Sequence, residues 1–526
     1  MQVIPKFPLS QLTVKHMTGF IRYISILILF STSAIAQNQK PNIVFILTDD
    51  LGYGDIAALN EQGKIKTPNI NRIAKAGVTF TDAHSSSAVC TPSRYGILTG
   101  RYNWRSTLKS GVLGFYGKPI IPTSRTTMAS MLREKGYQTA CIGKWHLGLN
   151  WTTKDGQKPV DNGKANNLDY AQKLTGGPTD LGFDYYFGVD APNYPPYAFI
   201  QNNEILGNPN EYYTFDKELD SRPGTGVKDW KQVDVLPVLN KKTTDFIAEA
   251  SKNNKPFFLY LPFTGPHTPV VPTTEFLGKS GINIYADFVM QMDAYVGDIL
   301  DVLEKNHVSD NTIVVFTSDN GCSPHANFPE LAEKGHDPSY IFRGTKADIF
   351  EGGHRIPCIV QWPNGIKAGQ KVAQTISLVD FMATFANLTD YQLKNNEGED
   401  SYDLTPLFKK ASYRKTIREA TVHHSINGSF SIRKGKWKLE LCPGSGGWSD
   451  PRPGSDAENS LPSIQLYDLE KDIAEENNVQ ASNPKVVAEL TALLTKYVNN
   501  GRSTPGPKQD NEGNFLPARM EWMSGK

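Results

Sequence analysis

Short apolar runs followed at once by polar residues recur along the chain. The run at 42–47 (NIVFIL) leads into two aspartates, and three further runs have the same character: 257–262 (FFLYLP), 312–316 (TIVVF) and 358–362 (CIVQW). Continuous apolar runs of this length are typical of strands buried on both faces, as in parallel sheets. The pattern therefore predicts four buried strands.

Helical periodicity separates these runs. Within 285–306, apolar residues recur at three- and four-residue spacing, namely Phe288, Met292, Val296, Ile299 and Leu303. Residues 126–134 predict another helix, with Gly136 as its stop signal. Strands that alternate with helices predict an α/β fold, with a mostly parallel central sheet sandwiched by helices.

The character of the chain changes near Leu404. Residues 429–441 alternate well enough to predict a hairpin, and 465–469 predict a further strand before a last helix at about 484–498. We expect an α/β catalytic domain at 37–403 and a smaller C-terminal antiparallel-sheet subdomain at 404–526. Within the first, 151–226 is rich in Asn, Gly, Pro and Tyr and predicts a long insertion that carries binding loops.

The N-terminus predicts a signal peptide over 1–36. Basic residues precede the apolar run 24–30, and Ala34-Ile35-Ala36 has the small-residue pattern of a cleavage site. The apolar run is too short to span a bilayer, so we expect no membrane span. These features predict a protein exported to a periplasm or secreted.

Charge and cysteine content narrow the function classes. The chain has 55 Lys and Arg against 54 Asp and Glu, a net charge of +1, which offers no global basic field for nucleic acid. Five cysteines is an odd number for an oxidising compartment. Whether four of them form disulfides stays open: Cys141, Cys322, Cys358 and Cys442.

Polar residues follow the predicted strands. Asp49 and Asp50 come after the first strand, His267 after the second, and Asp319 and Asn320 after the third. Ligands of α/β folds bind outside the carboxyl ends of the strands. Three carboxylates and an amide suit calcium better than zinc or magnesium, although N-capping and turn formation are alternatives for each pair.

Four motifs together identify a family. The segment CTPSR at Cys90 to Arg94 leads into YGILTGR, and GKWHLG, TGPHTP and RGTKAD follow in order. Alone, Cys90 is equally well interpreted as a buried small hydrophobe. The ordered set resembles the type I sulfatases of the alkaline-phosphatase superfamily, over Pro41 to Val479. One departure, Asp472-Ile473-Ala474 in place of the usual Asp-Pro, falls in the small subdomain.

The resemblance implies a mechanism. Cys90 would be oxidised to formylglycine by a maturating enzyme, and the aldehyde hydrate would attack the sulfur of a sulfate ester. His146 would act as base, and His267 with Lys346 would protonate the leaving oxygen. The remaining implied roles are stabilisation of the hydrate by Arg94 and Lys144, sulfate contacts by Lys144 and Lys346, and calcium binding by Asp49, Asp50, modified Cys90, Asp319 and Asn320.

The loops predict the substrate class. Aromatic and polar residues suit a sulfated carbohydrate, although ordinary loop packing explains each of them equally well; the candidates are Trp104, Arg105, Tyr194, Tyr197 and His424. An exported sulfatase of this kind is more plausibly a glycan sulfatase than a small-molecule arylsulfatase. The sequence also leaves open a phosphonate or phosphodiester hydrolase of the same superfamily and, more remotely, an inactive glycan-binding protein.

Overall fold

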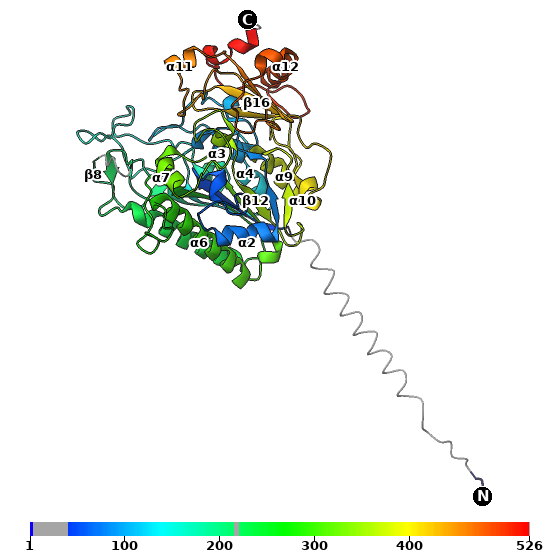
Figure 1. The fold of residues 1–526 in the computed structure, drawn as a ribbon. Helices are drawn as coiled ribbons and strands as arrows, with labels where there is room; N and C mark the ends of the chain where they lie inside the picture. Colours follow the sequence, from blue (N-terminus) through cyan, green and yellow to red (C-terminus); the bar gives the residue numbers. More distant parts are fainter. Residues whose placement is uncertain (4–39, 215–219, 525–526) are drawn as a thin grey trace. The chain divides into compact units, whose positions relative to one another are not determined.

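The computed structural model describes residues 1–3, 40–214 and 220–524 (Figure 1). The described residues from Asn42 onwards form one compact unit. The basic residues, apolar run and cleavage site of the predicted signal peptide lie outside the described residues. Among the described helices, none combines the length and apolar character needed to cross a membrane.

A ten-stranded sheet is the centre of the unit. Its middle strands are parallel: β1 (Asn42–Asp49) pairs with β10 (Phe257–Pro266) and β11 (Thr312–Ser318), and β10 pairs with β4 (Gln138–Lys144). The edges are completed on the β11 side by β12 (Cys358–Gln361), β2 (Val78–Phe80) and β13 (Gln370–Val372), and on the β4 side by β5 (Tyr185–Val189), β6 (Ile200–Gln201) and β7 (Glu204–Ile205).

All four apolar runs form strands, but one of these strands is not parallel to its neighbours as expected. Strand β12 is antiparallel to both of its neighbours, β11 and β2. It lies inside the sheet, and all of its residues are buried. Because both of its faces are buried, apolar and polar residues do not alternate along it, just as in a buried parallel strand. The sheet as a whole is mixed and mostly parallel, as predicted.

Successive side chains of β1 enter two separate cores. Ile43, Phe45 and Leu47 pack on one face, whereas Val44 and Ile46 pack on the other. The first core is covered by α3 (Cys90–Thr99), α4 (Met128–Glu134), α9 (Phe381–Leu388) and α10 (Thr405–Lys409), and the second by α2 (Pro68–Ala76), α5 (Val235–Ala250) and α6 (Ile284–Lys305). Helices α4 and α6 confirm the two helices predicted from periodicity.

A small antiparallel sheet follows in the C-terminal part. It contains β15 (Thr421–His424), β16 (Phe430–Lys434), β17 (Trp437–Glu440) and β18 (Gln465–Asp468) in sequence order, and α12 (Pro484–Asn500) shares its core. The predicted hairpin turns at Gly435, whose φ of 58° favours glycine. Leu404 and Leu407 pack in the core of the large sheet, so the small sheet begins only at β15.

Short elements complete the described chain. Within the 151–226 insertion, β5 to β7 extend the large sheet, and β8 (Glu211–Tyr213) pairs with β9 (Gly224–Gly226). The others are β3 (Ala83–His84), β14 (Ile376–Ser377), α7 (Phe328–Glu333), α8 (Glu351–His354) and α11 (Asp456–Asn459).

Candidate active site

Four strand ends and one helix start meet at the site. Asp49 and Lys144 are the last residues of β1 and β4, while His267 and Asp319 directly follow β10 and β11. These four strands are parallel neighbours, so their carboxyl ends lie at the same edge of the sheet. Cys90 begins α3, which packs on the face of this sheet.

Oxygen atoms cluster at the ends of β1 and β11. The backbone N–H of Asp50 donates to Asp319 Oδ1 at 3.2 Å, and Asn320 Nδ2 donates to Asp50 Oδ1 at 2.7 Å. Asp49 Oδ1 and Asn320 Oδ1 are buried and accept no hydrogen bond from the described residues, although Arg94 Nη2 lies 3.4 Å from Asp49 Oδ1. Buried oxygen acceptors without donors are costly unless a cation occupies the space between them. The donor set therefore fits a hard cation such as calcium.

Cationic side chains enclose the same oxygen cluster. Arg94 Nη2 lies 2.7 Å from Asp319 Oδ2, and Lys144 Nζ lies 2.6 Å from Asp49 Oδ2. Lys346 Nζ lies 2.7 Å from the Asp50 carboxylate. Three buried carboxylates are thus matched by three cations, and a bound divalent cation together with the product sulfate dianion would preserve this balance.

The pKa values of two of these carboxyl groups move in opposite directions. Burial acts to raise the pKa of Asp49, but Lys144 and the other nearby cations outweigh it and hold that pKa below its usual range. Burial and the neighbouring Asp49 raise the pKa of Asp319 well above its usual range, although Arg94 opposes the shift. A cation beside Asp319 would favour its ionised form.

His146 faces Cys90 with an unprotonated nitrogen. Its Nε2 lies 2.8 Å from the Leu113 carbonyl oxygen, which can only accept, so Nε2 carries the proton. Its Nδ1 then directs a lone pair towards Cys90 Sγ at 3.3 Å. Burial, reinforced by Lys144, lowers the pKa of His146 to about 3, which keeps the ring neutral. This arrangement suits a proton acceptor for a group at position 90.

His267 lies next to Asp50 of the oxygen cluster. Its Nδ1 donates to the carbonyl oxygen of Thr268 at 2.6 Å, and its Nε2 lies 3.9 Å from Asp50 Oδ2. Burial, with Lys346 as the next cause, lowers the pKa of His267 to about 4. To act as an acid, the ring must therefore gain a proton on Nε2 when an anionic substrate binds.

A cavity of about 250 Å³ connects the predicted catalytic residues. Its wall includes Cys90, Lys144, His146, His267 and Lys346. Arg94 lies behind it and donates from Nη1 to the carbonyl oxygen of Lys144 at 3.2 Å. The structure thus gathers all six side chains around one small space, while their individual roles stay predictions.

Of the five predicted substrate contacts, only Tyr194 lines this cavity. Arg105 is fully buried, with Nε 2.8 Å from Asp400 Oδ2 and its guanidinium 4.0 Å above the ring of Trp104, which is also buried. The other two are buried away from the cavity wall: the hydroxyl of Tyr197 donates to the carbonyl oxygen of Arg222, and Nδ1 of His424, the last residue of β15, lies 3.1 Å from the side chain of Asn103.

Other residues line the cavity in their place. They come from the insertion, from the loop after β11 and from the C-terminal part: Asn193, Asp220, Arg222, His325 and Trp448. The rule that ligands lie beyond strand ends could have identified His325, because it follows β11 closely. No sequence signal distinguishes Trp448, which reaches the cavity only through the fold.

Carboxylates, cations and histidines that converge on a small cavity at the strand ends define a hydrolase of anionic esters. The model of the Sulfatase family matches residues 41–391, and the chain belongs to this family. It is a sulfuric ester hydrolase, as the resemblance implied.

Individual relatives are similar over most of the chain. It is 34% identical to an N-acetylgalactosamine-6-O-sulfatase of Bacteroides thetaiotaomicron, over 87% of this chain and 93% of the relative. It is 30% identical to arylsulfatase G of Mus musculus, over 90% of this chain and 89% of that relative. A solved 6S-sulfatase structure, from work on glycosaminoglycan metabolism by Bacteroides thetaiotaomicron, superposes with a TM-score of 0.75 at 33% identity over 87% of this chain and 99% of that one.

Proposed function

We propose that this protein removes sulfate from a sulfated glycan by formylglycine-dependent, calcium-assisted hydrolysis. The observation that carries the proposal is the cavity in which Cys90, Lys144, His146, His267 and Lys346 surround one space beside the oxygen cluster. The space suits a sulfate group, because two lysines and two histidines face it together with the residue at position 90. The relative that carries the name N-acetylgalactosamine-6-O-sulfatase supports a 6-O-sulfated hexosamine as the first substrate to test.

The prosthetic groups would be held by residues of this chain. Asp49, Asp50, Asp319 and Asn320 would hold calcium together with position 90, and calcium would supply positive charge next to the sulfate oxygens. Formylglycine made from Cys90 would supply, as its hydrate, both the attacking oxygen and a second hydroxyl that allows sulfate to leave. The partner required is a formylglycine-generating or anaerobic sulfatase-maturating enzyme.

The other residues position charge and move protons. Lys144 and Lys346 bind sulfate oxygens, and Arg94 fixes Asp319 at the cation site. His146 accepts a proton at Nδ1 from the group at position 90, since that nitrogen already faces it with its lone pair. His267 supplies a proton from Nε2 to the leaving oxygen, with Lys346 as the neighbouring donor.

We also propose that the protein is exported. The signal-peptide pattern of residues 1–36 would deliver the chain to a periplasm or to the medium, where sulfated polysaccharides are degraded. A cell-fractionation experiment with a C-terminally tagged full chain tests this step. Retention of the uncleaved chain in the cytoplasm would contradict it.

Two measurements test the function. Mass spectrometry of the peptide that contains position 90 should show a species about 18 mass units lighter than the cysteine form, because sulfur is exchanged for oxygen with loss of two hydrogens. Sulfate release should then be compared for 6-O- and 4-O-sulfated N-acetylgalactosamine, an aryl sulfate and a phosphodiester. Faster turnover of the aryl sulfate alone would indicate an arylsulfatase, and faster turnover of the phosphodiester would indicate a hydrolase of that class.

A further inference from the structure

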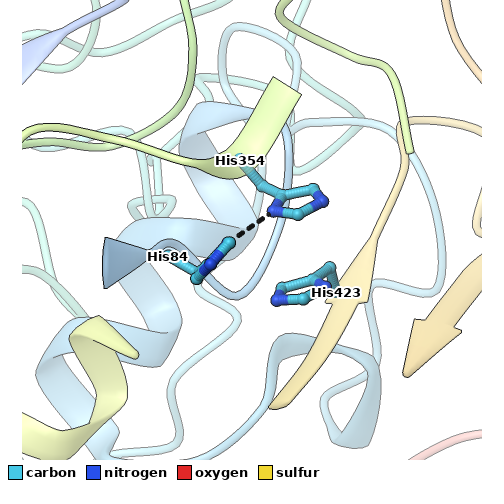
Figure 2. A group of neighbouring side chains, drawn as sticks. All are labelled: His84, His354 and His423. Carbon is cyan, nitrogen blue, oxygen red and sulfur yellow. Dashed lines mark hydrogen bonds between the residues drawn. The ribbon is translucent and has the colours of Figure 1, made fainter. Parts of the chain in front are cut away.

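Three histidines from β3, α8 and β15 meet away from the catalytic cavity. His84 ends β3, His354 ends α8 and His423 lies in β15, and all three are fully buried (Figure 2). Each offers one nitrogen, and the three nitrogens lie within 4.8 Å of one another. None of them lines the cavity with Cys90. The group therefore needs an explanation independent of sulfate hydrolysis.

Two of the rings direct lone pairs at each other. His354 Nε2 lies 3.0 Å from the Ile349 carbonyl oxygen, and His84 Nε2 lies 2.8 Å from Asp82 Oδ1. Asp82 is paired as a carboxylate with Arg433 Nη1 at 2.7 Å and Arg355 Nη2 at 3.4 Å. Arg433 Nη1, which can only donate, also lies 3.2 Å from His84 Nε2. Because the carboxylate is the closer of these two partners of His84, both Nε2 atoms carry the protons. In neutral rings the two Nδ1 atoms, 3.0 Å apart, are then both acceptors.

The third ring contributes an unpartnered nitrogen. His423 Nδ1 bonds Ser431 Oγ at 3.1 Å, whereas its Nε2 is buried without a hydrogen-bond partner among the described residues. Figure 2 shows the His423 ring stacked below that of His354, with one nitrogen on the side of His84. The two stacked ring centroids are 3.9 Å apart, and their planes differ by 7°. The two Nδ1 atoms and the unpartnered His423 Nε2 thus lie in one small buried space, and His423 Nε2 carries a lone pair when Ser431 Oγ accepts from Nδ1.

We propose that His84, His354 and His423 bind a structural transition-metal ion of the zinc type. Neutral imidazole is a preferred ligand of such ions. Two nitrogens bound to tetrahedral zinc lie about 3.3 Å apart, close to the observed 3.0 Å between the Nδ1 atoms. Asp82 and the Ile349 carbonyl orient the first two rings in the way that metal-bound histidines are usually oriented. The His423 ring tilts out of its stack to turn Nε2 towards the ion.

The ion would join the small sheet to the segment that precedes Cys90. Ser85 N donates to the His354 carbonyl oxygen at 2.9 Å, and Ala88 N donates to that of His424 at 2.9 Å. The backbone from β3 to α3 is therefore already bonded next to two of the three ligands. A metal ion at the histidines fixes β15, α8 and this segment together, which stabilises the fold without taking part in the reaction.

Metal analysis of the full-length chain tests the proposal. After growth with zinc, the purified protein should contain about one zinc ion per chain, and X-ray absorption should show a nitrogen shell with imidazole scattering. His423→Phe keeps a flat ring beside His354 but removes the ligand, so it should lose this zinc and several degrees of melting temperature. The matched control is His307→Asn, which changes an exposed histidine with a φ of 57° and should retain the zinc.

Two results would overturn the proposal. One is a folded wild-type protein that contains no zinc after zinc-replete growth, which would mean that a shared proton separates the two Nδ1 atoms. The other is equal zinc content in the wild type and in His423→Phe. If the variant does not fold, the absorption spectrum of the wild type decides alone, because an ion at the catalytic site would show oxygen ligands.

Discussion

Two buried charge clusters in this protein are built alike but differ in what they face. In the catalytic cluster, Lys144 and Lys346 pair with Asp49 and Asp50 and also line the cavity. In the cluster beneath the small sheet, Lys438 Nζ lies 2.7 Å from Glu475, 3.1 Å from Glu440 and 3.3 Å from Glu351. All four side chains of this second cluster are buried, and none lines the cavity.

The second cluster balances its charge internally. Burial, reinforced by Glu440 and Glu351, raises the pKa of Glu475 well above its usual range even though Lys438 opposes the shift. Glu475 can therefore keep a proton, and no ligand is needed to neutralise the group. Both clusters contain buried oxygens without a hydrogen-bond donor among the described residues, Asn320 Oδ1 in the first and Glu440 Oε1 in the second, but only the lysines of the catalytic cluster line a cavity. Access to a cavity, and not buried charge or an unpaired acceptor by itself, therefore distinguishes the functional cluster.

The largest expected effect is that of Cys90→Ser. Serine can attack sulfur once but lacks the second hydroxyl that expels sulfate, so multiple-turnover activity should fall by more than about a thousandfold. The melting temperature should stay within a few degrees. The control is Cys442→Ser, because a serine hydroxyl can keep the bond to the Gly444 carbonyl oxygen. Steady-state kinetics with full activity in Cys90→Ser would exclude the proposed mechanism.

Asp50→Ala should lower kcat/KM by about a thousandfold, a loss of about 4 kcal/mol of transition-state stabilisation. The substitution removes a candidate calcium ligand and leaves Lys346 without its partner. Calcium content per chain should fall in parallel when measured by mass spectrometry. An active Asp50→Ala protein with unchanged calcium content would separate Asp50 from the metal.

Lys438→Met tests whether the second cluster contributes to stability and not to activity. It leaves Glu440 and Glu475 without Lys438, while Glu351 keeps Arg355 and Arg433. The substitution should destabilise the fold by about 3–5 kcal/mol in denaturant unfolding. The specific activity of the folded fraction should not change, because the cluster does not reach the cavity. A loss of kcat at full stability would show that the two clusters are coupled.

The strand-end positions explain how much of the site could be predicted. Asp49, Asp50, Asp319 and Asn320 each follow a recognisable buried strand, and parallel pairing brings such positions together without knowledge of the side-chain packing. The resemblance to sulfatase motifs supplied the other residues of the site. The hydrophobic pattern could not predict the direction of β12, because a strand buried on both faces has the same apolar run whether it is parallel or antiparallel.

Loop residues could not be assigned in the same way. Arg105 is of a residue type that suits a ligand contact. Its guanidinium is instead neutralised by Asp400, which is far away in the sequence. Arg222 and Trp448 reach the cavity only because the insertion and the C-terminal part fold over the strand ends. Such contacts depend on tertiary packing, which local periodicity does not encode.

His267→Asn should distinguish leaving groups. Sugar alkoxides need a proton as they leave, so kcat for a sulfated sugar should fall about 10²- to 10⁴-fold. An activated aryl sulfate needs little protonation and should lose no more than about tenfold. Equal losses on both substrates would move the acid role to Lys346.

Arg222→Gln should have the smallest effect and tests the wall of the cavity. Arg222 forms an ion pair with Asp220, and both line the cavity together with the proposed sulfate-binding residues, so a sugar ring in the cavity would lie next to them. Loss of one charge-assisted hydrogen bond to the glycan should raise KM about tenfold and leave kcat for an aryl sulfate unchanged. Arg452→Gln, which changes an exposed arginine paired with Asp450, is the control and should alter neither value. An equal change of KM for glycan and aryl substrates would show that Arg222 acts on the sulfate group and not on the sugar.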